Sequence, residues 1–141
     1  MPAGKQFWDT NLWVYLFTVS TDPRDVAKQS RLLSLLTDAP DIAISAQVVN
    51  ELTNVLLQKF GYEAGHVLKI VEQIGQAIVV HPLTLDTSKK AIGIRQKLQL
   101  SWFDALIVSS ALDAECAVLL SEDMQHGFIV EDKLTILNPF V

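Results

Sequence analysis

Residues 6–11 have the sequence QFWDTN, in which a short apolar run ends at an acidic residue and a helical stretch follows. Other apolar runs of strand length occur at Ile42–Ile44, Ala77–Val80, Ala117–Leu120 and Leu134–Leu137. Longer stretches of helical periodicity separate these runs. Strands that alternate with helices predict an α/β fold, with a central, mostly parallel sheet of about five strands between two layers of helices, a three-layer α/β/α arrangement.

Length and composition limit the class of protein. The chain has 141 residues, of which 50% are hydrophobic and 19% charged, and we expect one domain over residues 1–141. No apolar run approaches the roughly 18 residues of a membrane-spanning helix, and Asp9 interrupts the apolar residues near the N-terminus, so we expect neither a membrane protein nor a secreted one. Cys116 is the only cysteine, which suits the reducing cytoplasm.

The net charge argues against a protein that simply holds nucleic acid. Eleven Lys and Arg residues stand against sixteen Asp and Glu residues, which leaves a net charge of -5. A protein that binds DNA or RNA by neutralising phosphates would be basic instead. A site built of carboxylates could still act on nucleic acid through a bound metal ion.

A helix is predicted over 23–37, where an aspartate in the N-cap position precedes a first-turn proline. Its buried stripe would consist of Val26, Leu33 and Leu36, and its basic residues would face outward. Another helix is expected at 84–98. The basic residues of these two helices are candidates for steering a nucleic-acid backbone, although a solvated helix face explains each of them as well: Arg24, Lys28, Arg31, Lys89, Lys90, Arg95 and Lys97.

Two helices near 46–60 and 62–74, separated by Gly61, are expected to form an αα-hairpin between the second and third strands. The hairpin carries more apolar side chains than one face of a small sheet requires, which predicts a contact surface. These side chains are Leu56, Leu57, Phe60, Tyr62, Val67, Leu68 and Val71.

Acidic residues follow two of the predicted strands, at the sheet edge where open α/β folds bind their ligands. Asp9 directly follows the first strand; it could cap the next helix, but Asn11 can perform that role and leave Asp9 free. Asp123 follows the fourth strand and could instead be a turn residue. Its neighbour Glu122 is expected to point away into solvent.

Two further acids lie on predicted helices. Glu51 borders the buried face of helix 46–60, a position that an ordinary boundary glutamate also occupies. Asp104 is the only charge in an otherwise apolar helix over 102–112, which should be buried. A capping box with Ser101 would explain its position. It would not explain an ionised group near a core, which costs several kcal/mol unless a cation or hydrogen bonds compensate it.

Four acids near one edge of a sheet, with no basic residue between them, would repel one another, and a divalent metal ion would relieve that repulsion. Oxygen ligands favour Mg²⁺ or Mn²⁺, whereas zinc would favour His or Cys, and the three histidines lack ligand spacing. The chain has no glycine-rich phosphate loop and no G-x-S-x-G elbow. The sequence therefore predicts a carboxylate site for a hard metal ion.

Four stretches resemble, in order and spacing, those of the PIN-domain nucleases: Phe7–Asn11, Ser45–Leu52, Ser101–Ile107 and Leu120–Met124. The closing residues 136–140 are similar as well, so the resemblance spans nearly the whole chain. The length of the chain is similar to that of the VapC toxins of toxin–antitoxin pairs.

This resemblance implies a Mg²⁺- or Mn²⁺-dependent endoribonuclease that cleaves single-stranded RNA. It implies an acidic quartet, which maps onto Asp9, Glu51, Asp104 and Asp123. Small polar residues near the metal ions would be Asn11 and Ser121. A small cognate antitoxin is the implied partner, and the apolar hairpin predicts a homodimer.

Two alternatives stay open at this point. A PIN-like module could bind RNA or a partner protein without cutting, and metal-dependent RNA cleavage that Asp9→Asn abolishes would separate it from the nuclease. A small phosphatase or a metal-dependent DNA nuclease would use the same carboxylates, and competition between RNA and DNA substrates would decide that case.

Overall fold

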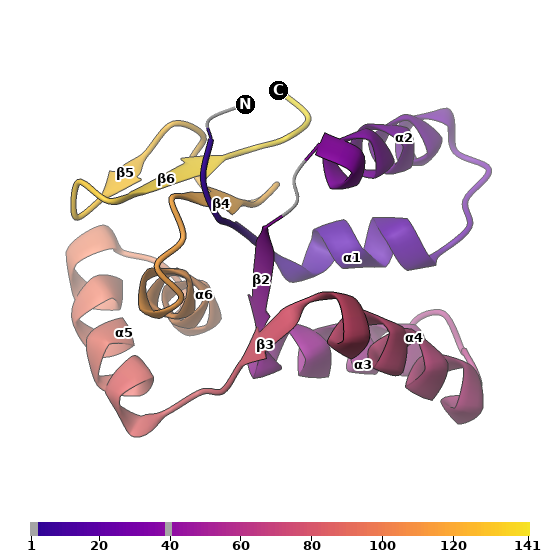
Figure 1. Cartoon of the computed structure of the whole chain (residues 1–141), viewed down its shortest axis with the longest axis horizontal. Helices are drawn as coiled ribbons and strands as arrows, with labels where there is room; N and C mark the ends of the chain where they lie inside the picture. The colour runs from indigo at the N-terminus through magenta and orange to yellow at the C-terminus, as the bar shows by residue number, and fades with distance from the viewer. Residues whose placement is uncertain (1–2, 39–40) are drawn as a thin grey trace.

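The computed structural model describes residues 3–38 and 41–141, and these form a six-stranded sheet in the order β3-β2-β1-β4-β6-β5 (Figure 1). Neighbouring pairs from β3 to β6 are parallel, whereas β5 runs antiparallel to β6. The predicted mostly parallel α/β sheet is thus confirmed. The strands are β1 (Gln6–Trp8), β2 (Ile42–Ser45), β3 (Val79–His81), β4 (Val118–Leu120), β5 (Ile129–Val130) and β6 (Leu134–Leu137).

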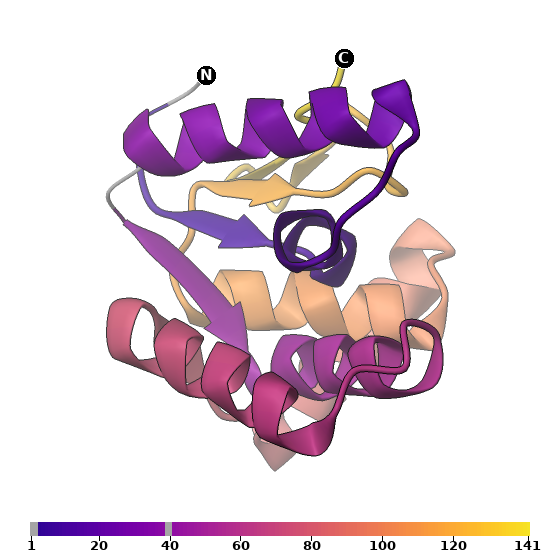
Figure 2. The same cartoon turned by 90° about the vertical axis from the view of Figure 1, so that its right-hand side faces the viewer.

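Helices cover both faces of this sheet. Figure 2 shows α2 above the strands and α3, α4, α5 and α6 below them. The helices of the described residues are α1 (Thr10–Phe17), α2 (Pro23–Asp38), α3 (Ala46–Gln58), α4 (Ala64–Ala77), α5 (Leu85–Leu98) and α6 (Trp102–Asp113). None of the helices in residues 3–38 and 41–141 has the length and apolar character needed to cross a membrane.

The core is centred on β1 and β4, which pair with each other in the middle of the sheet. Both strands are fully buried, and so is α6 from Ala105 to Ala111. This agrees with the prediction of a buried helix and leaves Asp104, in the first turn of α6, as an acid at the margin of the core. Because β1 and β4 are parallel, the residues that follow them lie at one edge of the sheet.

The sheet has one strand more than the five expected. The additional strand, β5, has two residues, and the residues that join it to β6 include Glu131 and Asp132 with φ of 52° and 56°. Such left-handed pairs form tight hairpin turns, but Asn-Gly is their usual sequence. Glu131-Asp132 differs from that pattern, so the sequence does not predict the β5–β6 hairpin.

The predicted faces of α2 and the predicted start of the third strand are wrong. Val26 and Leu33 are 47% and 52% exposed, whereas Leu32 and Leu35 are the buried residues of α2. Lys28 lies one turn before Leu32, on the inward side of the helix, so α2 has no wholly outward basic stripe. The third strand begins at Val79 because α4 continues to Ala77.

Candidate active site

Asp9 lies at the end of β1 and is the N-cap of α1. One carboxylate oxygen accepts the backbone N–H of Thr10 at 2.7 Å, and the other accepts the hydroxyl of Ser121 at 2.9 Å. The prediction that Asn11 would cap the helix in its place is therefore wrong: Asp9 caps it and still faces the end of β4. Burial raises the pKa of Asp9 to about 6, and the charges of Asp104 and Glu51 add to that rise against these hydrogen bonds.

Glu51 is half-buried on α3, where its carboxylate is held by two neutral side chains. Oε1 accepts the hydroxyl of Thr10 at 3.0 Å and the amide of Gln47 at 3.2 Å. The same amide nitrogen donates to the carbonyl of Phe103 at 3.1 Å, which ties α3 to the start of α6. Sequence reasoning missed Thr10 and Gln47, although the spacing of four residues between Gln47 and Glu51 places both on one helix face.

Asp104 occupies the first turn of α6, and its backbone N–H donates to Ser101 Oγ at 3.2 Å. The expected cap is therefore present. Even so, burial raises the pKa of the Asp104 carboxyl and the charge of Asp123 adds to the rise, while Ser101 acts in the opposite sense. The cap thus accounts for the position of Asp104 but leaves its charge without a cation.

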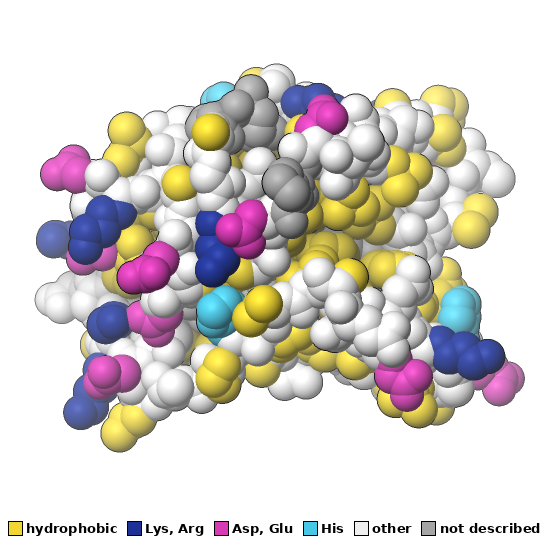
Figure 3. Space-filling view, in the orientation of Figure 1, with side chains coloured by type: hydrophobic (Ala, Val, Ile, Leu, Met, Phe, Trp, Pro, Cys, Tyr) yellow, Lys and Arg dark blue, Asp and Glu magenta, His cyan; other side chains and the backbone are white. Residues whose placement is uncertain are grey.

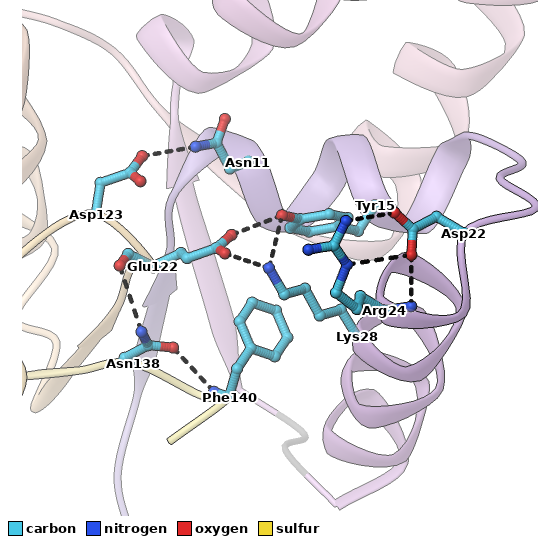
Figure 4. A network of polar contacts seen from close by, with 9 residues as sticks. All are labelled: Asn11, Tyr15, Asp22, Arg24, Lys28, Glu122, Asp123, Asn138 and Phe140. Carbon is cyan, nitrogen blue, oxygen red and sulfur yellow. Dashed lines mark hydrogen bonds and ion pairs between the residues drawn. The ribbon is translucent and has the colours of Figure 1, made fainter.

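Asp123 is exposed in the loop after β4, and its carboxylate accepts the side-chain amide of Asn11 at 2.7 Å (Figure 4). Ser121, two residues earlier, is fully buried against Asp9. Asn11 and Ser121 thus each hold one of the four predicted acids by a hydrogen bond.

The four acids form one electrostatic group. Asp9 interacts with Asp104 and with Glu51, and Asp104 interacts with Asp123, in each case so that one negative charge raises the pKa of another. Across residues 3–38 and 41–141, no Lys or Arg forms an ion pair with any of them.

The donor atoms of this group fit a hard divalent cation. Carboxylate and amide oxygens are the ligands that Mg²⁺ and Mn²⁺ prefer, and Gln47 beside Glu51 has a buried Oε1 without a hydrogen-bond partner. Within the described ranges, no three His, Cys, Asp or Glu side chains already stand close enough to enclose an ion. Binding would therefore have to draw the carboxylates together.

Most of the basic residues proposed for steering have partners of their own. Lys28 pairs with Glu122, which overturns the prediction that Glu122 is solvated. Arg31 donates to the carbonyl of Pro139. Arg24 pairs with Asp22, and Lys90 with Asp113, in contacts at the surface. In the described part of the chain, three exposed basic residues of α5 make no side-chain hydrogen bond or ion pair: Lys89, Arg95 and Lys97.

Trp13 and His126 make structural contacts near the site. Trp13 is buried, and its indole N–H donates to the carbonyl of Trp8, so its ring belongs to the core. His126 accepts the backbone N–H of Asn138 at 2.9 Å. The His126 imidazole therefore joins its own loop to the segment that follows β6.

Comparison with known proteins supplies the context for this geometry. The profile of the PIN domain family matches residues 7–127, a span that includes the four acids. A search of curated proteins finds no match.

Solved structures share the fold at low sequence identity. A chain of a toxin–antitoxin complex from Klebsiella pneumoniae has a TM-score of 0.70 and 18% identity, over 96% of this chain and 98% of that one. Mycobacterium tuberculosis VapC20, described as a sarcin-ricin loop cleaving toxin, has a TM-score of 0.67 and 18% identity, over 84% and 92%. A chain of Rickettsia felis VapBC2, solved with a DNA fragment from its promoter, has a TM-score of 0.64 and 17% identity, over 94% and 98%.

Proposed function

Since the chain belongs to the PIN domain family, we propose that it is a metal-dependent endoribonuclease that cleaves single-stranded RNA and acts as the toxin of a toxin–antitoxin pair. The observation that carries the proposal is the group of four coupled acids without a basic partner among the described residues. An acid group of this kind is unfavourable in a purely structural role, because the charges of Asp104 and Glu51 raise the pKa of Asp9 and that of Asp123 raises the pKa of Asp104.

Asp9, Glu51, Asp104 and Asp123 are the side chains that would hold one or two Mg²⁺ or Mn²⁺ ions. A bound ion would lower the pKa of a coordinated water and stabilise negative charge on the scissile phosphate and the leaving oxygen. Asp9 would be a central ligand, because it is oriented by two hydrogen bonds and lies within reach of the charges of both Asp104 and Glu51.

The neutral side chains around the acids would fix ligand geometry. Thr10 and Gln47 orient the Glu51 carboxylate, Ser121 orients that of Asp9, and Asn11 orients that of Asp123. Neutral donors suit this role because they hold a carboxylate without neutralising the charge that attracts the metal ion. The free cations at Lys89, Arg95 and Lys97 stay candidates for contacts with the RNA backbone.

Cleavage of a fluorescent single-stranded RNA tests the activity. We expect cleavage with Mg²⁺ or Mn²⁺, none in excess EDTA, and none by Asp9→Asn. Unlabelled single-stranded RNA should compete better than DNA of the same sequence. Cleavage that persists in EDTA would contradict the metal mechanism. Binding of RNA without cleavage in the presence of either metal would favour the non-catalytic module.

A small antitoxin is the proposed partner, supported by the toxin–antitoxin complexes among the similar structures. A cavity of about 420 Å³ extends from Asn11 along α1 to Phe60 and includes Val14 and Val26. A partner segment seated in this cavity would contact Asn11, which holds Asp123. We expect expression of the chain alone in the cytoplasm to slow growth, and unchanged growth under strong expression of folded protein would contradict the toxin role.

A homodimer is the second proposed assembly. Leu57, Phe60 and Leu68 of the α3–α4 hairpin are 36%, 38% and 58% exposed, whereas Leu56 and Val67 are buried in the core, so only part of the predicted apolar surface is free. Figure 3 shows charged side chains gathered over α5 and the β5–β6 hairpin, and hydrophobic ones in the hollow between α2 and α4. Light scattering at micromolar concentration should show a dimer, and a strict monomer would contradict this proposal.

A further inference from the structure

The loop that carries Asp123 is held at three consecutive residues. The backbone N–H of Ser121 donates to the carbonyl of Leu137 at 3.0 Å, and its hydroxyl donates to Asp9. Asp123 accepts from Asn11. Glu122, between them, points toward Tyr15 on α1 and Lys28 on α2 (Figure 4). The side chain of Glu122 therefore contributes nothing directly to the acid group.

Glu122 is held by two side chains from two different helices. Its Oε2 accepts the hydroxyl of Tyr15 on α1 at 2.8 Å, and its Oε1 forms an ion pair with Lys28 Nζ on α2. Lys28 Nζ also donates to the Tyr15 hydroxyl at 3.2 Å, which closes a triangle of polar contacts. The side chains of Lys28 and Glu122 are only 28% and 22% exposed, so this pair is better shielded from water than an ordinary surface ion pair.

The C-terminal segment covers the same triangle. Lys28 Nζ lies 5.2 Å from the centroid of the Tyr15 ring and 5.3 Å from that of Phe140, and the two rings meet edge to face. Asn138 donates its side-chain amide to the backbone carbonyl of Glu122 at 3.3 Å. Both the side chain and the main chain of Glu122 are therefore fixed from outside its own loop.

One face of α1 connects this triangle to the acid group. Asn11 and Tyr15 are four residues apart, one above the other on the helix, and they hold Asp123 and Glu122 respectively. A shift of Glu122 would therefore pull on Asp123. Asp123 itself is exposed, with one side-chain hydrogen bond to keep it in place.

We propose that Lys28 is a positioning residue, which acts through Glu122 to fix the loop 121–123 and to hold the Asp123 carboxylate ready for a divalent cation. The inference rests on the proposed function, because it assigns Asp123 as a metal ligand. It replaces direct steering of RNA as the role of Lys28. Losing a side chain that hydrogen-bonds directly to a metal ligand weakens metal binding by about 10–100-fold, and Lys28, one contact further out, is expected to act at the lower end of that range.

Lys28→Met keeps the length of the apolar stem and removes the ammonium group. We expect the Kd for Mn²⁺, measured by calorimetry without RNA, to rise about 10-fold, and Lys28→Arg to restore most of the affinity. The matched control is Arg24→Met, which removes the same charge from the same helix; among the described residues, the Arg24 guanidinium bonds to Asp22 alone. This control should leave the Kd for Mn²⁺ unchanged. Equal effects of the two substitutions would show an unspecific charge effect and overturn the proposal.

Hydrogen exchange provides a readout that does not depend on the metal. Backbone amides of residues 121–125 should exchange faster in metal-free Lys28→Met than in the wild type, and those of β2 should not. Unchanged exchange in the loop would overturn the proposal, whatever the metal affinity. A wild-type protein that binds no Mn²⁺ would instead overturn the proposed function. Faster exchange in Lys28→Met would in that case still support the role of Lys28 in fixing the loop 121–123.

Discussion

The two aspartates of α6 have opposite electrostatic environments. Asp113, in the last turn, is hydrogen-bonded by Lys90 at 2.8 Å and by Thr87 at 2.8 Å. Burial favours a higher pKa for Asp113, but these hydrogen bonds and the Lys90 charge outweigh it and lower the pKa below the ordinary value. Asp104, in the first turn, has a raised pKa because burial and Asp123 outweigh its bond with Ser101. The fold therefore provides a cation for Asp113, whereas no Lys or Arg of the described residues pairs with Asp104.

This contrast separates a structural acid from a candidate ligand on physical grounds. A helix favours negative charge at its N-terminus and disfavours it at its C-terminus, so the dipole of α6 alone would stabilise Asp104 and destabilise Asp113. The pKa directions are the reverse, because burial and the charge of Asp123 act on Asp104, whereas hydrogen bonds from Lys90 and Thr87 act on Asp113. Lys90 supplies the cation at one end, and we propose that a metal ion supplies it at the other.

The largest expected difference between the two ends is in RNA cleavage. Asp104→Asn keeps the size of the side chain and removes a proposed ligand, so it should lower the Mn²⁺-dependent rate by about 100-fold or more. Asp113→Asn removes an equal charge at the other end of α6 and should leave the rate unchanged. A similar loss in both variants, with circular dichroism showing both folded, would contradict the assignment of the site to the N-terminal end.

The stability of the metal-free protein should show the strain at Asp9. Its pKa of about 6 in the folded state lies above the ordinary 3.8, so the fold favours the protonated form. The contribution of Asp9 to the free energy of unfolding should therefore fall as the pH rises from about 4 to 6, by up to about 3 kcal/mol. Asp9→Asn should remove this dependence and be the more stable protein at pH 7.5 in EDTA. Urea unfolding across this pH range measures it, and a variant less stable than the wild type at pH 7.5 would contradict the account.

The smallest effect is expected at the C-terminal end of α6, where Lys90 pairs with Asp113. Lys90 is 58% exposed, and removing an exposed partner of an ion pair costs less than about 1 kcal/mol. Lys90→Met should therefore lower the thermal midpoint slightly and change neither cleavage nor Mn²⁺ affinity. A large loss of cleavage would mean that the two ends of α6 are coupled.

The sequence predicts the parts of this molecule that depend on strand ends and helix starts. Asp9 and Asp123 could be placed at the same sheet edge because each follows an apolar run, and Asp104 stood out as the only charge in an apolar helix. The resemblance also indicates Asn11 and Ser121, whereas Thr10 is not predicted, since its hydroxyl meets Glu51 only after α1 packs on α3. Lys28 and Glu122 lie 94 residues apart, so the sequence does not predict their ion pair either.

Calorimetric titration of Mn²⁺ into three metal-free proteins would show whether the acid group binds a cation. We expect saturable binding by the wild type, equally tight binding by Asp113→Asn, and binding by Asp104→Asn that is at least about 10-fold weaker. An Asp104→Asn variant that binds Mn²⁺ as tightly as the wild type, or a wild type that binds none, would contradict the assignment of these carboxylates to a metal site.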